Sequence, residues 1–110
     1  MSLPLRWTEQ AAEQLGSIAE YISLTSPVYA EQVADRIVLR LRQAQAFPES
    51  GRRVPEAGEL DVREVIERPY RLLYRVRPTV IEVLAIVHAR QDLGAALSGG
   101  VPGVSNRADR

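Results

Sequence analysis

One histidine and a few arginines are the residues of this chain best suited to chemistry. His88 is the only histidine, and Arg63, Arg71 and Arg90 lie in the same C-terminal half of the sequence. Imidazole titrates near neutral pH, and guanidinium groups stabilise the negative charge that develops on a phosphate. Attack of a ribose 2′-hydroxyl on its own phosphodiester needs a base, an acid and such cations. With Arg63 or Glu64 to position a substrate, a Glu–Arg–His constellation of this kind could cleave RNA.

The same residues also have a structural interpretation, which we favour over catalysis. His88 then ends a strand and bonds to backbone, while the arginines pair with acids on neighbouring strands. Three acids are available to Arg71 and Arg75, namely Glu64, Glu67 and Glu82. Arg52 and Arg53, which open a loop, are interpreted either as solvated charge or as a contact for a phosphate or an acidic partner.

These side chains depend on a predicted β-hairpin. Residues 70–77 alternate between Tyr, Leu or Val and mostly Arg, the pattern of a half-buried strand. Residues 80–88 are rich in β-branched residues, which indicates a strand covered on both faces. Pro78 favours a type I turn in a loop of about four residues. This loop predicts four facing pairs: Val76 with Ile81, Arg75 with Glu82, Tyr74 with Val83, and Leu72 with Ala85.

Unbroken alternation along this hairpin has a consequence for the charged residues. Arg71, Arg75, His88 and Arg90 would all project from one face of the sheet. Several cations with one imidazole on a single face make a candidate anion site.

The first half of the chain is predicted to be mainly helical. Residues 3–7 are short and apolar and predict an edge strand, where Pro4 is tolerated. Thr8 predicts the N-cap of an amphipathic helix over about residues 9–24. Ser26 and Pro27 predict the start of a second helix, which Phe47-Pro48 ends. The short link makes the two helices an antiparallel hairpin.

Residues 49–61 follow as a loop in which Gly51 and Gly58 allow positive φ. Residues 62–68 predict a further strand, with Pro69 at a bulge or strand start. The order β-α-α-β-β-β predicts an α+β fold, with an N-terminal edge strand and the helical hairpin packed on one face of a small antiparallel sheet. Residues 1–97 form the expected single domain, including a last short helix or strand over 91–97, and residues 98–110 are expected to be disordered.

Composition limits the classes of function. The chain has 110 residues, no cysteine and a formal net charge of +0, and all 14 basic residues are arginine. Disulfides and thiolate metal sites are therefore excluded, and a generic polyanion binder is disfavoured. No apolar run approaches the length that a bilayer needs, and no signal peptide is evident. We expect a cytoplasmic protein with no membrane, cofactor or metal association.

A series of short motifs in a fixed order resembles the RelE/ParE superfamily of toxins from bacterial type II toxin–antitoxin operons. The resemblance covers about residues 5–93. The motifs are Trp7-Thr8, Ile18-x-x-Tyr21-Ile22 before Ser26-Pro27, Phe47-Pro48-x-x-Gly51-Arg52, Val62-Arg63-Glu64, Tyr70-Arg71-Leu72-Leu73-Tyr74-Arg75-Val76, and Val87-His88-x-Arg90-x-Asp92-Leu93.

Within the superfamily, the chain looks most like the ParE branch. That resemblance implies a toxin that inhibits DNA gyrase without being a hydrolase. The alternative RelE branch cleaves mRNA in the ribosome with several basic residues and, commonly, a late Tyr or His. This chain has no lysine and no tyrosine after Tyr74, which departs from that pattern. A third hypothesis is a non-toxic relative that only binds its partner.

The resemblance also implies a protein partner. A cognate antitoxin from a neighbouring gene would wrap around the toxin and form a hetero-oligomer with it. An acidic antitoxin segment would meet Arg52, Arg71, Arg75 and Arg90. Tyr21 and Tyr29 are candidate apolar contacts for its helix, with ordinary helix packing as the alternative.

Overall fold

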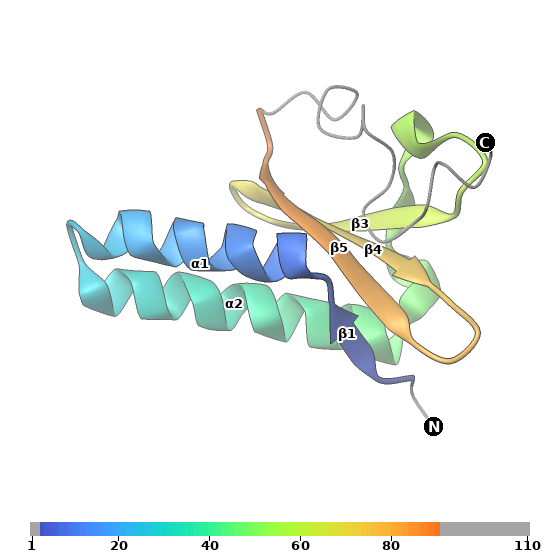
Figure 1. Ribbon diagram of the computed structural model, residues 1–110, viewed down its shortest axis with the longest axis horizontal. Coiled ribbons are helices and arrows are strands. Elements are labelled where there is room, and N and C mark those ends of the chain that lie inside the picture. The colour runs from blue at the N-terminus through green and yellow to red at the C-terminus, as the bar shows by residue number, and fades with distance from the viewer. Residues whose placement is uncertain (1–2, 91–110) are drawn as a thin grey trace.

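The computed structural model describes residues 3–90, which form a helical hairpin packed against one five-stranded sheet (Figure 1). In chain order the elements are β1 (Leu5–Trp7), α1 (Glu9–Ser23), α2 (Pro27–Ala46), η1 (Pro48–Ser50), β2 (Arg52–Arg53), η2 (Pro55–Ala57), β3 (Val62–Glu67), β4 (Tyr70–Val76) and β5 (Ile81–His88). The predictions for residues 91–97 and 98–110 lie outside the described residues. Within residues 3–90, neither helix is both long and apolar enough to cross a membrane.

Side-chain caps begin both helices where the sequence predicts them. The Thr8 hydroxyl accepts a hydrogen bond from the Ala11 N–H at 3.2 Å, and the Ser26 hydroxyl accepts one from the Tyr29 N–H at 3.1 Å. Each cap satisfies one of the N–H groups that lack a partner in the first turn of a helix. Pro27 lies at the start of α2, where a missing donor costs nothing.

The sheet has the order β1-β5-β4-β3-β2 and is mixed rather than wholly antiparallel. β1 lies at an edge, as predicted, but runs parallel to β5, with Leu5 opposite Ile81 and Trp7 opposite Val83. The direction of an edge strand depends on the path of the chain through the helical hairpin. The local alternation of residues carries no information about it.

The register of the β4–β5 hairpin is confirmed for three of the four predicted pairs, but the fourth is wrong. Val76 faces Ile81, Arg75 faces Glu82 and Tyr74 faces Val83, whereas Leu72 faces Ile86 instead of Ala85. A β-bulge causes the shift, because β5 places one extra residue, Leu84, between the partners of Leu73 and Tyr74.

Side chains are buried on both faces of the central strands. The helix-side core contains Leu72, Tyr74, Val83 and Ile86 together with α2 residues such as Ile37. The outer core, on the opposite face, contains Val54, Val62, Leu73, Leu84, Ala85 and Val87. β4 is therefore not half-buried as predicted, because residues 52–61 cover its second face with β2, η2 and the buried Val54.

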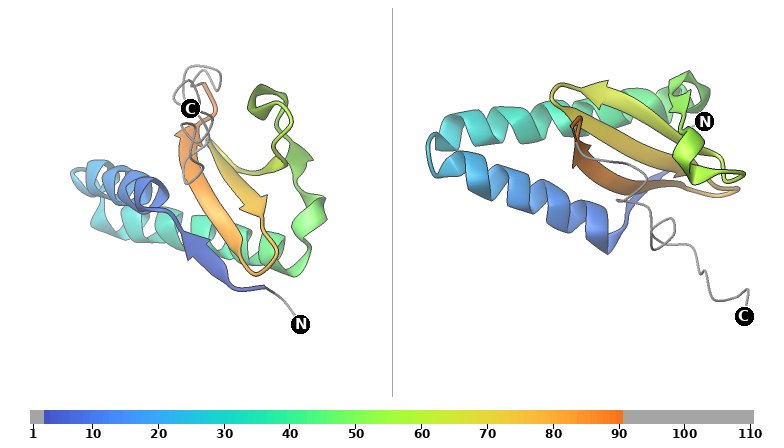
Figure 2. Two further views of the ribbon diagram at one scale, coloured as in Figure 1. Left: turned by 45° about the vertical axis from the view of Figure 1, so that its right-hand side comes forward. Right: turned by 90° about the horizontal axis from the view of Figure 1, so that it is seen from above.

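The helical hairpin is longer than the sheet it covers. The views in Figures 1 and 2 agree that the α1–α2 turn extends beyond the strands. The turn end of the hairpin therefore projects from the sheet into solvent.

Candidate functional site

A buried ionic cluster joins β2, β3 and β4 on the outer face of the sheet. Glu64 is only 4 % exposed, and its Oε1 lies 2.5 Å from Nε of Arg71. Its Oε2 accepts hydrogen bonds from Arg52, with Nε at 2.8 Å and Nη2 at 2.5 Å. Burial alone would raise the pKa of Glu64, but the hydrogen bonds from Arg71 and Arg52 outweigh burial and lower the pKa below its ordinary value of 4.5. The predicted pairing of Arg71 with Glu64 is thus confirmed.

A second buried carboxylate lies further along the same face. Glu82 is fully buried and pairs with Arg6 of β1 and with Arg77, whose Nη1 lies 3.3 Å from Oε1. Arg75 is directly opposite Glu82 in the register but makes no ion pair with an acid among residues 3–90. The interpretation that Arg75 pairs with Glu82 is therefore wrong. The sequence analysis missed both arginines. Arg77 lies five residues from Glu82 across the predicted hairpin loop, which was a signal for this pair, whereas Arg6 reaches Glu82 only through the parallel pairing of β1 with β5.

Arg63 lies on the helix side of the sheet and holds the loop that follows α2. Its Nη1 donates hydrogen bonds to the carbonyls of Glu49 at 3.1 Å and Gly51 at 3.0 Å. Its Nε lies 3.3 Å from Oδ1 of Asp61. Because Arg63 faces the helix-side Tyr74 across the ladder, it lies on the opposite face from Arg71.

The Tyr74 hydroxyl is the other anchor of this loop, and the sequence carried no signal of it. The hydroxyl donates to the Pro48 carbonyl at 2.6 Å and accepts from the Gly51 N–H at 3.1 Å. Burial raises the pKa of Tyr74 above its ordinary value. The prediction that Gly51 adopts a positive φ is wrong, because its φ is −74°. The same prediction for Gly58 is confirmed, with φ 67°. Gly51 instead leaves room for Tyr74 and for the Glu64 carbonyl, which would lie 2.9 Å from an added Cβ.

Replacing Tyr74 with phenylalanine should therefore destabilise the protein by about 1–3 kcal/mol, because the buried Gly51 N–H and the part-buried Pro48 carbonyl both lose their partner. Urea unfolding of the two proteins measures the difference. Tyr70→Phe is the matched control, since no hydrogen bond involves the Tyr70 hydroxyl within residues 3–90. Equal midpoints for wild type and Tyr74→Phe would contradict this anchoring role.

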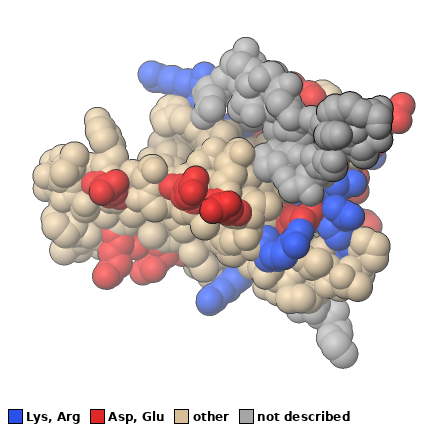
Figure 3. All heavy atoms as spheres, viewed as in Figure 1, with Lys and Arg blue, Asp and Glu red and all other residues tan. Residues whose placement is uncertain are grey.

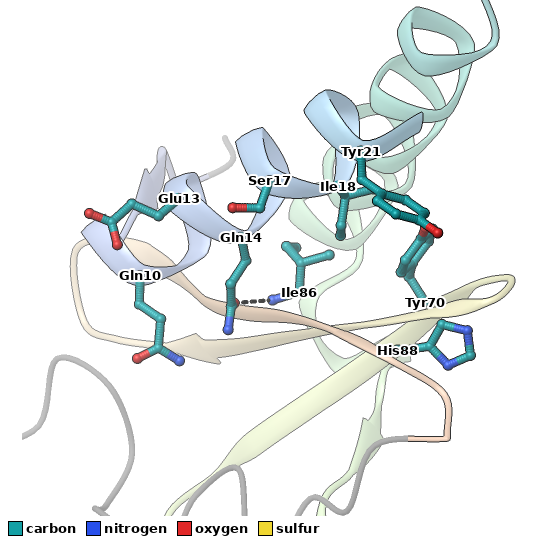
Figure 4. Close-up of a pocket in the computed structure, with 9 residues that line it drawn as sticks. All are labelled: Gln10, Glu13, Gln14, Ser17, Ile18, Tyr21, Tyr70, Ile86 and His88. Atoms are coloured by element: carbon teal, nitrogen blue, oxygen red, sulfur yellow. Dashed lines mark hydrogen bonds between the residues drawn. The ribbon is translucent and has the colours of Figure 1, made fainter. Parts of the chain in front are cut away.

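His88 lines a different region, a pocket of about 670 Å³ between α1 and the strands (Figure 4). The Tyr70 and His88 rings meet edge to face with centroids 6.0 Å apart. Nδ1 of His88 accepts a hydrogen bond from the Arg90 N–H at 3.1 Å, which agrees with the structural interpretation of this histidine. Two residues of α1 also line the pocket. The side-chain oxygen of Gln14 accepts a hydrogen bond from the Ile86 N–H at 2.8 Å, and the Tyr21 ring points toward Tyr70.

The prediction that Arg71, Arg75, His88 and Arg90 share one face is wrong for His88. The bulge at Leu84 reverses the orientation of the β5 residues that follow it, because one extra residue moves each later side chain of the strand to the other face. His88 therefore lies on the helix side with Tyr70, opposite Arg71. The candidate ribonuclease residues do not converge: Arg63 and Arg71 lie on opposite faces, and each is engaged by the protein itself.

The predicted partner contacts have different exposures. Tyr21 is 77 % and Tyr29 49 % exposed, and the guanidinium of Arg36 lies 5.8 Å from the Tyr29 ring centre. Arg90 and most of the Arg52 side chain are exposed, whereas Arg71 is largely buried against Glu64. Within residues 3–90, no group of His, Asp and Glu side chains is arranged to hold a metal ion.

Comparisons with known proteins return toxins with two names, ParE and RelE. Residues 5–93 match the model of the family described as ParE toxin of type II toxin–antitoxin system, parDE. The protein named Toxin RelE2 from Caulobacter vibrioides is 31 % identical over 84 residues, which are 76 % of this chain and 91 % of that protein.

Solved structures give the same result at the level of the fold. The chromosomal ParDE toxin–antitoxin system from P. aeruginosa contains a chain that superposes with a TM-score of 0.65 at 30 % identity, covering 79 % of this chain and 96 % of that one. The toxin–antitoxin complex RelBE2 from Mycobacterium tuberculosis gives 0.55 at 21 % identity, covering 80 % and 99 % of the two chains. A mutant of E. coli toxin RelE in the free state gives 0.56 at 21 % identity, with 87 % and 93 % covered.

Proposed function

The chain belongs to the family of ParE toxins of type II toxin–antitoxin systems, and on that premise we propose that it inhibits DNA gyrase and is neutralised by a cognate antitoxin. Gyrase inhibition requires binding to the enzyme and no bond-making chemistry by the toxin. The cytoplasm, where gyrase and DNA are found, is the corresponding location. The family match, which runs to residue 93, supports assigning residues 1–97 to the toxin domain.

The observation that carries a non-enzymatic mechanism is the separation of the residues that RNA cleavage would need. Stabilising a developing phosphorane requires cations aimed at one point, together with a proton donor or acceptor within hydrogen-bond reach of it. Here Arg71 bonds to Glu64 on one face, while Arg63 bonds to loop carbonyls on the other. His88 lies on the helix side at the far end of β5. This arrangement suits protein binding better than catalysis.

A cognate antitoxin is the second partner that we propose. Solved relatives named ParDE and RelBE2 are toxin–antitoxin systems, which supports an antitoxin partner for this chain. We assign an acidic antitoxin segment to Arg52, Arg71, Arg75 and Arg90, of which Arg71 would first have to release Glu64. Tyr21 and Tyr29 would contact an amphipathic helix laid along the hairpin. An arm of this kind covers a large surface at the cost of the entropy of ordering it.

Ribosome-dependent mRNA cleavage is the second candidate, and one observation favours it: the relative at 31 % identity is named for RelE. In that case His88, with Arg63, Arg71 and Arg90, would carry the reaction. The protein would have to rearrange on the ribosome, since the ion pairs that engage Arg71 and Arg63 must open.

Induced expression with and without the neighbouring gene separates these functions in one culture. Supercoiling of a reporter plasmid and the positions of mRNA 5′ ends are measured together. We expect relaxed or broken plasmid with intact mRNA, rescue by the neighbouring gene, and full toxicity of the His88→Ala variant.

The opposite pattern overturns the proposal. Intact plasmid, discrete mRNA cuts and a harmless His88→Ala variant would establish the nuclease. A protein that causes no growth defect but still binds the neighbouring gene product would be a non-toxic partner-binding relative.

A further inference from the structure

The projecting end of the helical hairpin carries an exposed apolar cluster, here called the hairpin tip and defined as Tyr21, Leu24, Val28 and Tyr29. Their exposed fractions are 77, 80, 68 and 49 %. Leu24 ends α1 and Val28 lies in the first turn of α2, so the cluster surrounds the turn between the helices. No strand lies beneath the turn between the helices (Figure 2), although Tyr21 lines the pocket beside Tyr70. Leu24 and Val28 belong to neither core, so the apolar area around the turn is available to another molecule.

The charges around the tip are mostly acidic, although the guanidinium of Arg36 lies 5.8 Å from the Tyr29 ring centre. Residues 7–35 include five acids and no arginine: Glu9, Glu13, Glu20, Glu31 and Asp35. Residues 36–90 instead carry 11 arginines and 7 acids. Figure 3 shows acidic side chains spread along the helical hairpin, while most of the basic ones lie toward the sheet. The net charge is zero, but the charges are unevenly distributed. The hairpin end is acidic and apolar, and the sheet end is basic.

This combination specifies the chemistry of the partner. An apolar cluster flanked by Glu20 and Glu31 complements an apolar depression surrounded by lysine or arginine. Two tips placed against each other would bring like charges together, which disfavours a symmetric second copy. An enzyme that binds DNA necessarily presents Lys- and Arg-rich surfaces to the phosphates.

We propose that the hairpin tip is the surface with which this toxin binds DNA gyrase, on a basic region of the enzyme. The proposal rests on the proposed function and adds the contact surface to it. An antitoxin helix over Tyr21 and Tyr29 would cover half of the tip, which gives neutralisation a steric cause.

The double variant Leu24→Ser/Val28→Ser tests the tip without touching the two tyrosines assigned to the antitoxin. We expect its half-inhibitory concentration for supercoiling by purified gyrase to rise about 30-fold, the effect of losing an interface hot spot. Phe47→Ser is the matched control, because Phe47 is 71 % exposed but lies at the other end of α2. That control should inhibit like wild type, and both variants should keep wild-type melting temperatures and antitoxin binding.

A second variant, Glu20→Gln/Glu31→Gln, tests the charge and removes any dependence on how the serine variant folds. Binding of wild type to gyrase should weaken as salt rises, and this variant should show a shallower salt dependence. Glu49→Gln/Glu59→Gln, which neutralises two exposed acids outside the hairpin, should keep the wild-type slope.

Three outcomes overturn the proposal. If the folded serine variant inhibits gyrase as well as wild type does, the tip is not the contact surface, although gyrase remains the target. If wild type does not inhibit gyrase, both the proposed target and the proposed contact surface are wrong. A wild-type dimer in sedimentation that becomes monomeric in the serine variant makes the tip a self-association surface.

Discussion

Replacing Glu64 with alanine is expected to destabilise the protein by about 3–5 kcal/mol, because the substitution leaves buried Arg71 without its counter-charge. Only 16 % of the Arg71 side chain is exposed, and its Nε is within 2.5 Å of Glu64. The same substitution releases Arg52, and with it β2, whose two residues pair only with β3. Urea unfolding measures the loss. Glu67→Ala is the matched control, since its contact with Arg36 is longer, at 3.6 Å, and exposed, and should be worth about 0–1 kcal/mol.

The pH dependence of stability in a Glu64→Gln variant separates the charge of Glu64 from its packing. Because the pKa of Glu64 is lowered in the folded state, its contribution is fully present above the unfolded value near 4.5. It is lost as pH falls through the lowered folded value. A Glu64→Gln variant keeps the volume but lacks this titration, so its stability should fall less than that of wild type in the acid range below pH 4.5. Parallel acid curves for the two proteins would contradict the role of this ion pair.

The elements that local chemistry determines could be predicted from the sequence. Thr8 and Ser26 are caps because a hydroxyl can accept a first-turn N–H, and each is followed by a helix with an apolar stripe. Pro78 lies in the loop of four residues that it predicts, so the near half of the β4–β5 hairpin has the predicted register. These features need only residues close together in the chain.

The far half of that hairpin could not be predicted, and the face of His88 depended on it. Residues 83–87 are apolar on both faces of β5, so the alternation that would reveal a bulge is absent. Leu84 carries none of the usual signs of one, such as glycine or proline. A charged residue in a strand is normally predicted to be exposed. The burial of Glu64 and Glu82 could not be predicted, because it depends on arginine partners from other strands.

Arg71 and Arg75 are two residues apart on one strand, yet the structure gives them different roles. Arg71 is neutralised inside the protein by Glu64, and an incoming acid would have to displace that carboxylate. Arg75 is half-buried and meets no acid among residues 3–90, because Arg6 and Arg77 occupy its cross-strand neighbour Glu82. Of the two, Arg75 is the guanidinium better placed to receive an acidic antitoxin segment.

Arg75→Ala should therefore weaken binding of the purified antitoxin about 30-fold, as expected when an interface arginine is lost, while the melting temperature stays close to that of wild type. Arg71→Ala should do the reverse, lowering stability because it leaves buried Glu64 with Arg52 alone. Isothermal titration of the antitoxin and thermal melts of both variants give the two readouts. Arg42→Ala, an exposed arginine of α2, is the control and should change neither. If Arg75→Ala binds the antitoxin as tightly as wild type does, the acidic segment must contact other arginines, and Arg52 and Arg90 become the next residues to replace.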